Sequence, residues 1–415
     1  MAKYVPPHKR NLKVAVEGET VTPPSQTAQR VQNCSSSWES FGSLERKNET
    51  KAVKGGRFRF AIHSIFRFCL AGSTSDDHDH HGSIRLQPLS GDSIFLRTKH
   101  FTEKPCILVC TCSETKDVNK MMSRGKNPIV TMSDMILSDL KRFQYVRDQE
   151  MAFDQYKNGK LSFVARFGTI LFHEKPSTGI DTMSSNSDVE AILDPVKRTF
   201  NTMIPSSFVE SILGSVVLEI GFDSEVEKEY YYVKLVDKQR RNETLSCKCT
   251  AGIGGKLEHH KIELNQLRHL VWDIACLEND VDLRFMLATR RILTGVTDSE
   301  KHDITNLIES AVIDRTVLGN LRWPLGIKYC GDRYSVIATA YTKSKYFKNS
   351  LMSMKLSDYD RYDYWTLKRD VTRQVSLKMT GIAEHIRGKN FEPGPLTEML
   401  QEHLKLIWDH FLSCV

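Results

Sequence analysis

Residues 229–249 read EYYYVKLVDKQRRNETLSCKC. Two runs rich in β-branched and aromatic residues, Glu229–Asp237 and Thr244–Cys249, flank the polar segment Gln239–Asn242, whose length suits a hairpin. Runs of the same kind recur on both sides: Val216–Phe222, Lys256–Leu264, His269–Leu277 and Val281–Thr289. The stretch therefore predicts a meander of mostly antiparallel strands.

Outside this meander, strands and helices follow one another without regular alternation. Lys160–His173 is apolar on both faces, which is typical of an interior strand. Further strands are predicted at Arg57–Leu70, Ser93–Thr98, Lys104–Cys112, Gly326–Cys330, Tyr334–Thr342, Leu351–Leu356 and Asp370–Met379. Helices are predicted at Ser133–Arg142, in two pieces within Asp188–Leu213, at Asp298–Ile308 and at Pro395–Leu412. This pattern indicates an α+β fold with a β-rich body and a few helices.

The terminal helix has the clearest amphipathic pattern in the chain. Leu396, Leu400, Leu404, Ile407 and Phe411 recur at helical spacing. A stripe this apolar is expected to dock on the body and close its core. The alternative is a detachable helix that binds a partner.

Three regions differ in composition. Residues 1–54 carry proline pairs and a serine tract and lack apolar periodicity, so we expect a disordered basic arm. Residues 55–185 are predicted to form a β-rich region with a short helix. Residues 186–415 are predicted to form an α+β region that ends in the amphipathic helix, unless the last two regions make one composite domain.

Positive charge is concentrated near the N-terminus. Residues 1–60 contain eleven Lys and Arg against five Glu, a net charge of +6, while the whole chain carries +7. The body is therefore electrically balanced, and its net charge alone does not indicate a nucleic-acid-binding surface.

Compartment and metal content follow from what the sequence contains. No run approaches the roughly 18 apolar residues of a membrane helix, and no signal peptide begins the sequence, so we expect a soluble, eukaryotic protein of cytoplasm or nucleus with reduced cysteines.

Five cysteines could suggest zinc: Cys106, Cys110, Cys112, Cys247 and Cys249. On a strand, residues i and i+2 are too far apart for one zinc ion, so buried thiols and no metal or cofactor are predicted.

Catalytic motifs are not recognisable. The glycine-rich segment at residues 250–256 lacks the spacing of a phosphate-binding loop and is better explained as a turn between strands. The acidic and histidine-rich loop at residues 76–81 is expected to be solvated. His403 and His410 are assigned packing or surface roles on the terminal helix. Whether the protein is an enzyme stays uncertain, and the sequence favours a non-enzymatic role.

Two segments favour binding. Lys238, Arg240 and Arg241 form a basic hairpin tip that could reach phosphate, with an ordinary solvated turn as the alternative. The patch could be extended by Arg284, Arg290 and Arg291. The segment Asp358–Trp365 is dense in Tyr, Trp and Arg, which are enriched at recognition hot spots. Because its aspartates would repel phosphate, we expect a protein-facing patch or a partly buried strand and turn.

The first residues carry one family resemblance. Tyr4-Val5-Pro6-Pro7-His8-Lys9-Arg10 resembles the Tyr-Val-Pro-Pro-His-Leu-Arg element near the N-terminus of eukaryotic DEAD-box RNA helicases of the translation-initiation type, with Lys9 in place of Leu. In that family the element is associated with binding the cap-binding initiation factor. The resemblance implies a link to RNA metabolism, with Tyr4, Lys9 and Arg10 as candidate contacts.

These observations predict a non-enzymatic RNA-associated factor or ribonucleoprotein scaffold. The basic arm would attract phosphates, and the folded body would contact RNA or ribonucleoprotein components and protein partners, without a membrane. The alternatives are an enzyme of unrecognised type with a cleft between the β-rich halves, or a pure protein-interaction module.

Overall fold

We describe a computed structural model of the 415-residue chain. It describes residues 65–71, 83–89, 105–111, 128–150, 160–173, 186–239, 243–263, 267–290, 297–323, 333–388 and 392–413. All of these belong to one compact unit. Within these ranges no helix is both long and apolar enough to span a membrane.

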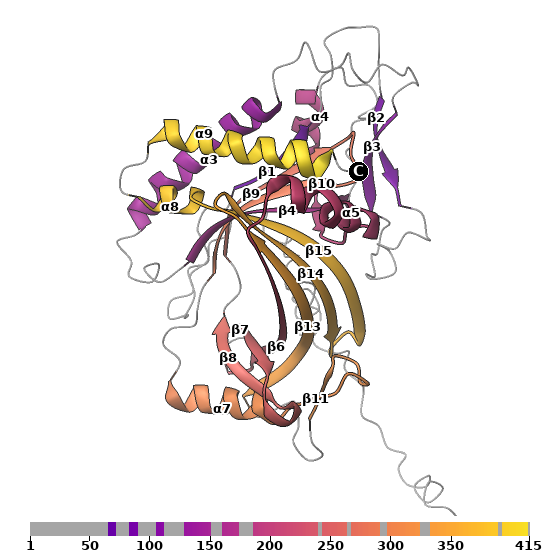
Figure 1. The fold of residues 1–415 in the computed structure, drawn as a ribbon, viewed down its shortest axis with the longest axis vertical. Helices are drawn as coiled ribbons and strands as arrows, with labels where there is room; N and C mark the ends of the chain where they lie inside the picture. Colours follow the sequence, from indigo (N-terminus) through magenta and orange to yellow (C-terminus); the bar gives the residue numbers. More distant parts are fainter. Residues whose placement is uncertain are drawn as a thin grey trace, which may run out of the picture. The chain divides into compact units, whose positions relative to one another are not determined.

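One large sheet organises the described chain (Figure 1). Its strands run in the order β1-β9-β10-β4-β15-β14-β13-β6-β7-β8. Outside this order, β3 and β5 pair with β4, and β2 pairs with β3. Only β1 and β9 pair in parallel among these strands. The bounds are β1 Ile65–Ala71, β2 Ser83–Pro88, β3 Cys106–Thr111, β4 Lys160–Phe172, β5 Arg198–Asn201, β6 Ser224–Asp237, β7 Glu243–Ala251, β8 Leu257–Glu263, β9 Leu267–Cys276, β10 Asp282–Arg290, β13 Tyr334–Lys348, β14 Met352–Asp363 and β15 Lys368–Met379; β11 Val312–Ile313 and β12 Leu321–Arg322 form a separate pair. The predicted α+β class with mostly antiparallel strands is confirmed.

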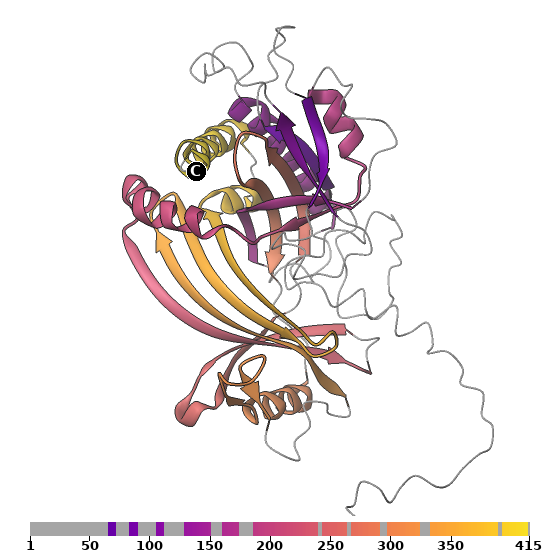
Figure 2. The same cartoon turned by 90° about the vertical axis from the view of Figure 1, so that its right-hand side faces the viewer.

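The helices gather at two ends of the sheet. Helices α3, α8 and α9 lie together near β1, β9 and β10, whereas α7 lies beside β7 and β8 (Figure 1). Between these ends, β6, β13, β14 and β15 are long and strongly curved (Figure 2). The helical bounds are α3 Pro128–Glu150, α4 Asn186–Leu193, α5 Ser206–Ser211, η5 Ile212–Val216, α6 Val217–Ile220, η6 Ile253–Gly255, α7 Asp298–Glu309, α8 Ile382–Arg387, α9 Pro393–Leu406 and η7 Ile407–Leu412.

The strand register separates the two faces of the sheet. Directly opposed residues of antiparallel neighbours share a face, and adjacent residues of one strand point to opposite faces. A row of six buried residues crosses six strands in this way: Phe347, Met354, Leu377, Ala165, Phe285 and Trp272. This face belongs to the main hydrophobic core, together with buried residues of α3, α8 and α9. Helices α3, α8 and α9 therefore cover this face of the sheet, whereas α4 packs on the other face against Phe68 of β1 and Ile170 of β4.

The terminal helix docks as its stripe predicts. Its five apolar positions are at most 2% exposed and belong to the main core: Leu396, Leu400, Leu404, Ile407 and Phe411. Phe411 stacks on Phe167 of β4, with ring centres 5.4 Å apart. This contact ties the last residues of the described chain to the centre of the sheet.

Two carboxylates, one in α4 and one just after it, accept hydrogen bonds from the outer edge of β1. The backbone N–H of Leu70 donates to Glu190 of α4, at 2.6 Å, and that of Phe68 donates to Asp194, the residue that follows α4, at 2.8 Å. Unpaired amides on an edge strand invite pairing with another chain. Because these two side chains accept the hydrogen bonds, this edge is covered.

Three local predictions were wrong. Val216–Phe222 was predicted as a strand, but residues 206–220 are helical through α5, η5 and α6, and the helix stops at Gly221 with φ of +67°. Residues 198–201 lie within the predicted helical stretch Asp188–Leu213 but form strand β5, because the chain leaves α4 before Pro195. Residues 83–88 form β2, where no strand was predicted. Strand pairing with β4 and β3 decides the last two.

Candidate functional site

A polar row lies on the sheet face opposite the main core. Tyr346 of β13, Lys355 of β14, Ser376 of β15 and Arg166 of β4 stand directly opposite one another in that order. Each is partly exposed. Adjacent strands are about 4.8 Å apart, so Lys355 and Arg166, two strands apart, lie within about 10 Å of each other at the backbone. The row brings cations from distant parts of the sequence onto one surface.

Neighbouring rows on this face repeat the same composition. By register they add lysines and tyrosines from β6, β7, β14 and β15. We call this surface the lysine–tyrosine face, and it comprises Arg166, Lys228, Tyr230, Tyr232, Lys248, Tyr346, Lys355, Tyr359 and Lys378. At its centre Thr342 stands between Tyr230 and Tyr359. The Thr342 hydroxyl is buried and has no hydrogen-bond partner among the described residues.

Tyrosine rings hold the lysine ammonium groups. Lys248 Nζ lies 3.3 Å from the ring centre of Tyr230. Lys228 and Lys355 approach the ring of Tyr346 from flanking strands, at 5.9 Å and 5.8 Å. These distances are within the range of a cation–π interaction. The tyrosine rings thus fix the positions of the lysine side chains on this face.

Lys355 is the most enclosed of these cations. Its Nζ donates to the hydroxyl of Tyr359 at 2.9 Å and lies 5.2 Å from the centre of that ring. Burial acts most strongly on its pKa and lowers it, but the combined effect of Tyr359, Tyr232 and Tyr346 raises the pKa above the ordinary lysine value. Lys355 is therefore fully charged at physiological pH.

The opposite face of the same strands is built differently. There, each of four cations is paired with a carboxylate across the strands: Lys343 with Glu227 at 2.8 Å, Lys345 with Glu225 at 2.9 Å, Arg373 with Asp358 at 2.6 Å and Arg369 with Asp360 at 2.8 Å. On the lysine–tyrosine face, Lys228, Lys355 and Lys378 make no ion pair with a carboxylate of the described chain. On the same side as these lysines, by register, Arg361 of β14 does bind a carboxylate, that of Asp363 at 3.0 Å. The contrast between the two faces therefore concerns Lys228, Lys355 and Lys378.

The polar row continues into a buried ion cluster. Arg284 of β10 follows Arg166 in the row and binds Asp273 of β9 at 2.5 Å, and Arg198 of β5 binds the same carboxylate at 3.1 Å. Burial opposes ionisation of Asp273, but the two guanidinium groups outweigh it and keep its pKa below the ordinary value. Arg284 was expected to extend a surface patch. It is instead 4% exposed and has a structural role.

The predicted binding residues largely fall outside this surface. Lys238 is exposed in the turn after β6, ten residues beyond Lys228. For Arg290, the last residue of β10, only the backbone is described. The other predicted contacts lie outside the described residues: Tyr4, Lys9, Arg10, Arg240, Arg241 and Arg291. The basic hairpin tip and the N-terminal motif therefore stay predictions.

The aromatic segment Asp358–Trp365 is the last half of β14 and the turn after it. Register places Tyr359 on the lysine–tyrosine face, while Asp358 and Asp360 point to the opposite face, where arginines bind them. The expected partly buried strand and turn is confirmed. Alternation along the strand thus separates Asp358 and Asp360 from Tyr359, whereas Asp363 lies on the same side as Tyr359. The expected repulsion of phosphate stays a prediction.

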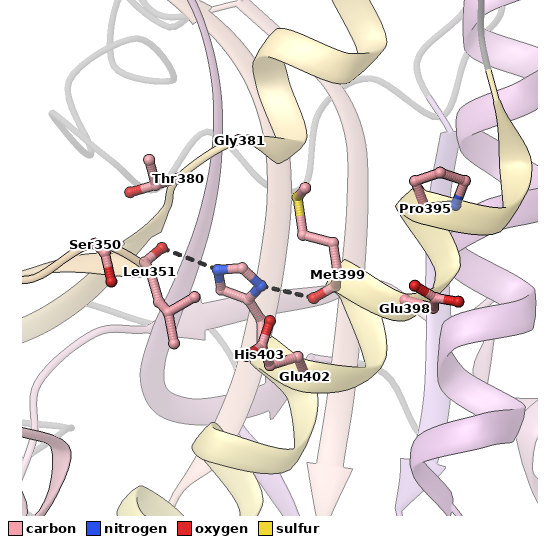
Figure 3. A pocket seen from close by; sticks show the side chains of 9 residues that line it. All are labelled: Ser350, Leu351, Thr380, Gly381, Pro395, Glu398, Met399, Glu402 and His403. Carbon is pink, nitrogen blue, oxygen red and sulfur yellow. Dashed lines mark hydrogen bonds between the residues drawn. The ribbon is translucent and has the colours of Figure 1, made fainter.

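A pocket of about 550 Å³ lies on the helical side, between α9 and the ends of β14 and β15 (Figure 3). Its lining includes the side chains of Glu398, Glu402 and His403. The His403 ring is 1% exposed and lies between two backbone carbonyls, with Nδ1 2.6 Å from Met399 O and Nε2 3.0 Å from Leu351 O. His403 therefore ties α9 to the start of β14, which confirms a packing role.

Four of the five cysteines considered as zinc ligands lie within the described residues. Cys106, Cys247 and Cys249 are buried, Cys110 is half-buried, and Cys112 lies outside the described residues. Burial raises the pKa of Cys249 to about 12, so it stays protonated. In the part of the chain that the structure describes, no three His, Cys, Asp or Glu side chains are grouped to hold a metal ion.

Comparison with protein families places the chain. A family model described as a domain of unknown function, DUF7903, matches residues 52–411. The chain belongs to this DUF7903 family. The matched range begins just before the β-rich body and leaves out most of the predicted basic arm. No curated protein matches the sequence.

Solved structures resemble the DUF7903 chain at low identity. The Schizosaccharomyces pombe Pct1 RNA triphosphatase is 11% identical, with 72% of this chain and 97% of that chain covered and a TM-score of 0.41. The same protein in complex with the Spt5 CTD is 8% identical, with 72% and 98% covered and a TM-score of 0.42. The Mimivirus capping enzyme triphosphatase is 9% identical, with 67% and 96% covered and a TM-score of 0.27. The scaffold role expected from the sequence stays a prediction.

Proposed function

We propose that the protein is an RNA-associated factor that binds single-stranded RNA through the lysine–tyrosine face. The observation that carries this proposal is the contrast between the two faces of β6, β13 and β14. Cations on one face are bound by carboxylates, whereas Lys228, Lys355 and Lys378 on the other are not. A surface of uncompensated lysines attracts phosphates.

The composition of the face supports a single strand as the ligand. Proteins that bind single-stranded nucleic acids combine a positively charged track along the backbone with aromatic side chains. Here both kinds of residue alternate with hydroxyl groups over four neighbouring strands. The N-terminal resemblance to RNA helicases supports RNA as the nucleic acid, and the basic arm would add sequence-independent attraction.

Binding is tested by fluorescence anisotropy with a labelled single-stranded RNA of about 15 nucleotides, a length in the range that such surfaces cover. Affinity should fall as salt rises, with a slope of about 0.7 per phosphate contact on a logarithmic plot. Lys228→Gln and Lys355→Gln should each weaken binding and lower that slope by about 0.7.

Matched controls lie on the same strand as Tyr346. Lys343→Gln and Lys345→Gln remove lysines of β13 that face the opposite side and bind Glu227 and Glu225. They should leave affinity and slope unchanged. Equal losses from both faces would show that attraction is non-specific and would contradict the proposed site. A separate phosphate assay is run with a 5′-triphosphate RNA under the same conditions. Release of inorganic phosphate would favour the enzyme alternative over a purely binding role.

A further inference from the structure

Tyr346 occupies a special place on the lysine–tyrosine face. Its strand, β13, lies between β6, which carries Lys228, and β14, which carries Lys355. Both ammonium nitrogens lie within 6 Å of its ring centre. One aromatic ring therefore holds two positive charges that repel each other and that no carboxylate of the described chain neutralises.

We propose that Tyr346 is a positioning residue that holds Lys228 and Lys355 as a two-lysine clamp for adjacent phosphates of one strand. This inference rests on the proposed function and specifies the part of the ligand that is recognised. The clamp would bind a chain with at least two neighbouring phosphates in preference to an isolated phosphate. The negative face of the ring attracts both ammonium groups and offsets part of their mutual repulsion. Two neighbouring phosphates then meet two charges already in place.

The surroundings of the clamp support this assignment. Lys355 is fixed further by the hydroxyl of Tyr359, at 2.9 Å, while Lys228 of β6 is exposed. The Tyr346 ring thus links one fixed cation to one accessible cation. A carboxylate in the position of Tyr346 would also hold two lysines, but it would cancel charge that the ligand needs.

The first experiment compares ring variants. Tyr346→Phe keeps the aromatic face and should bind 5′-phosphorylated diadenylate, which has two phosphates, within about twofold of the unmodified protein. Tyr346→Leu removes the ring and should lose about tenfold in affinity, as two cation–π contacts of ordinary strength would give. Loss of binding to adenosine 5′-monophosphate should be much smaller, because a single phosphate needs only one lysine.

The control is Tyr341→Leu. Tyr341 lies on the same strand but on the opposite face, where Arg315 contacts its ring at 5.2 Å. This variant also removes a cation–π contact, and it should leave the affinity for the dinucleotide unchanged. If Tyr341→Leu and Tyr346→Leu weaken binding equally, the effect is a general loss of strand order and the clamp is refuted.

A second measurement does not need the ligand. Reductive ¹³C-methylation of lysines followed by NMR reports the N-methyl resonances of Lys228 and Lys355 in the intact protein. Tyr346→Leu should move the resonances of both, because the ring that both ammonium groups contact is removed, whereas Tyr346→Phe should preserve them. Unchanged resonances together with unchanged dinucleotide affinity overturn the clamp, even if RNA still binds elsewhere on the face.

The two measurements separate the inference from the proposed function. If both lysine resonances move as expected but the unmodified protein binds no RNA, the clamp stands and the RNA assignment fails. Inorganic polyphosphate serves as the competing arm in that case. Polyphosphate binding that is lost in Tyr346→Leu would keep the two-lysine clamp and replace the nucleic acid strand by a polyphosphate chain.

Discussion

At the scale of single residues, Asp282 is the clearest pH-sensitive group. Its carboxylate accepts the backbone N–H groups of Ile170, at 2.7 Å, and Cys276, at 3.0 Å, and joins β4 to the β9–β10 turn. Burial raises its pKa from 3.8 to about 7, although these two donors oppose the shift. Between these values the native state keeps a proton that the unfolded state loses, so stability contributed by this group falls as pH rises from about 4 to 7.

Asp282→Asn keeps a neutral side chain of the same shape and should remove this dependence. Urea unfolding at pH 5 and pH 8 measures the outcome. The unmodified protein should lose stability relative to the variant on going to pH 8, by at most ~1.4 kcal/mol per pH unit while the group titrates. A difference between the two proteins that is constant with pH would show that Asp282 is ionised in the folded state throughout this range.

Sequence reasoning found few residues of the candidate site because the site is a product of register. The sequence shows that Tyr230, Tyr232 and Lys234 stand at every second position of one strand. It does not show that Lys355 and Arg166 lie on the same face, because that follows only from pairing across β13, β14, β15 and β4. The alternation of side chains along a strand also explains why Asp358 was expected to lie beside Tyr359. The two residues are neighbours in the sequence but lie on opposite faces of the sheet.

At the scale of elements, the terminal helix gives a direct stability prediction. Leu404 is 2% exposed in the main core, so Leu404→Ala should cost about 2–5 kcal/mol in the free energy of unfolding. Lys405→Ala, one residue further on the exposed side of α9, should change it by less than about 0.5 kcal/mol. Equilibrium unfolding of both variants is the measurement. Equal, small effects would indicate a helix that detaches to bind a partner.

The elements that the sequence predicted best are those with a strong local period. Helix α7 matches its predicted bounds to within a residue, and its Thr297 cap and Glu300 form the reciprocal hydrogen bonds of a capping box. Val216–Phe222 failed because a run of β-branched residues fits a strand locally, while packing of Ile212 and Val216 into the core requires a helix. Gly221, which ends that helix at positive φ, was the one local signal for the correct assignment.

At the scale of the whole molecule, the class of fold was predictable and the architecture was not. Apolar alternation along the sequence indicates strands, and the number of strands indicates an α+β body. The alternation does not reveal which strands pair. Strand β4, from the predicted 55–185 region, pairs with β10 and β15 of the 186–415 region. These pairings join both regions in one sheet. The polar faces of β13 and β14 carry no apolar pattern, so the sequence offered no signal for their order.

The last prediction concerns the arm. The family match begins at residue 52, and residues 1–50 lack the apolar period needed to pack, so a chain that starts at residue 51 should keep its melting temperature within about 2 °C. Residues 1–50 hold seven Lys and Arg against five Glu, so their removal takes away a net charge of only +2. RNA affinity should therefore fall only slightly, because the lysine–tyrosine face remains. Calorimetry and anisotropy on the truncated chain measure both. A melting temperature lower by several degrees would mean that the arm packs on the body, and complete loss of RNA binding would move the binding site from the sheet to the arm.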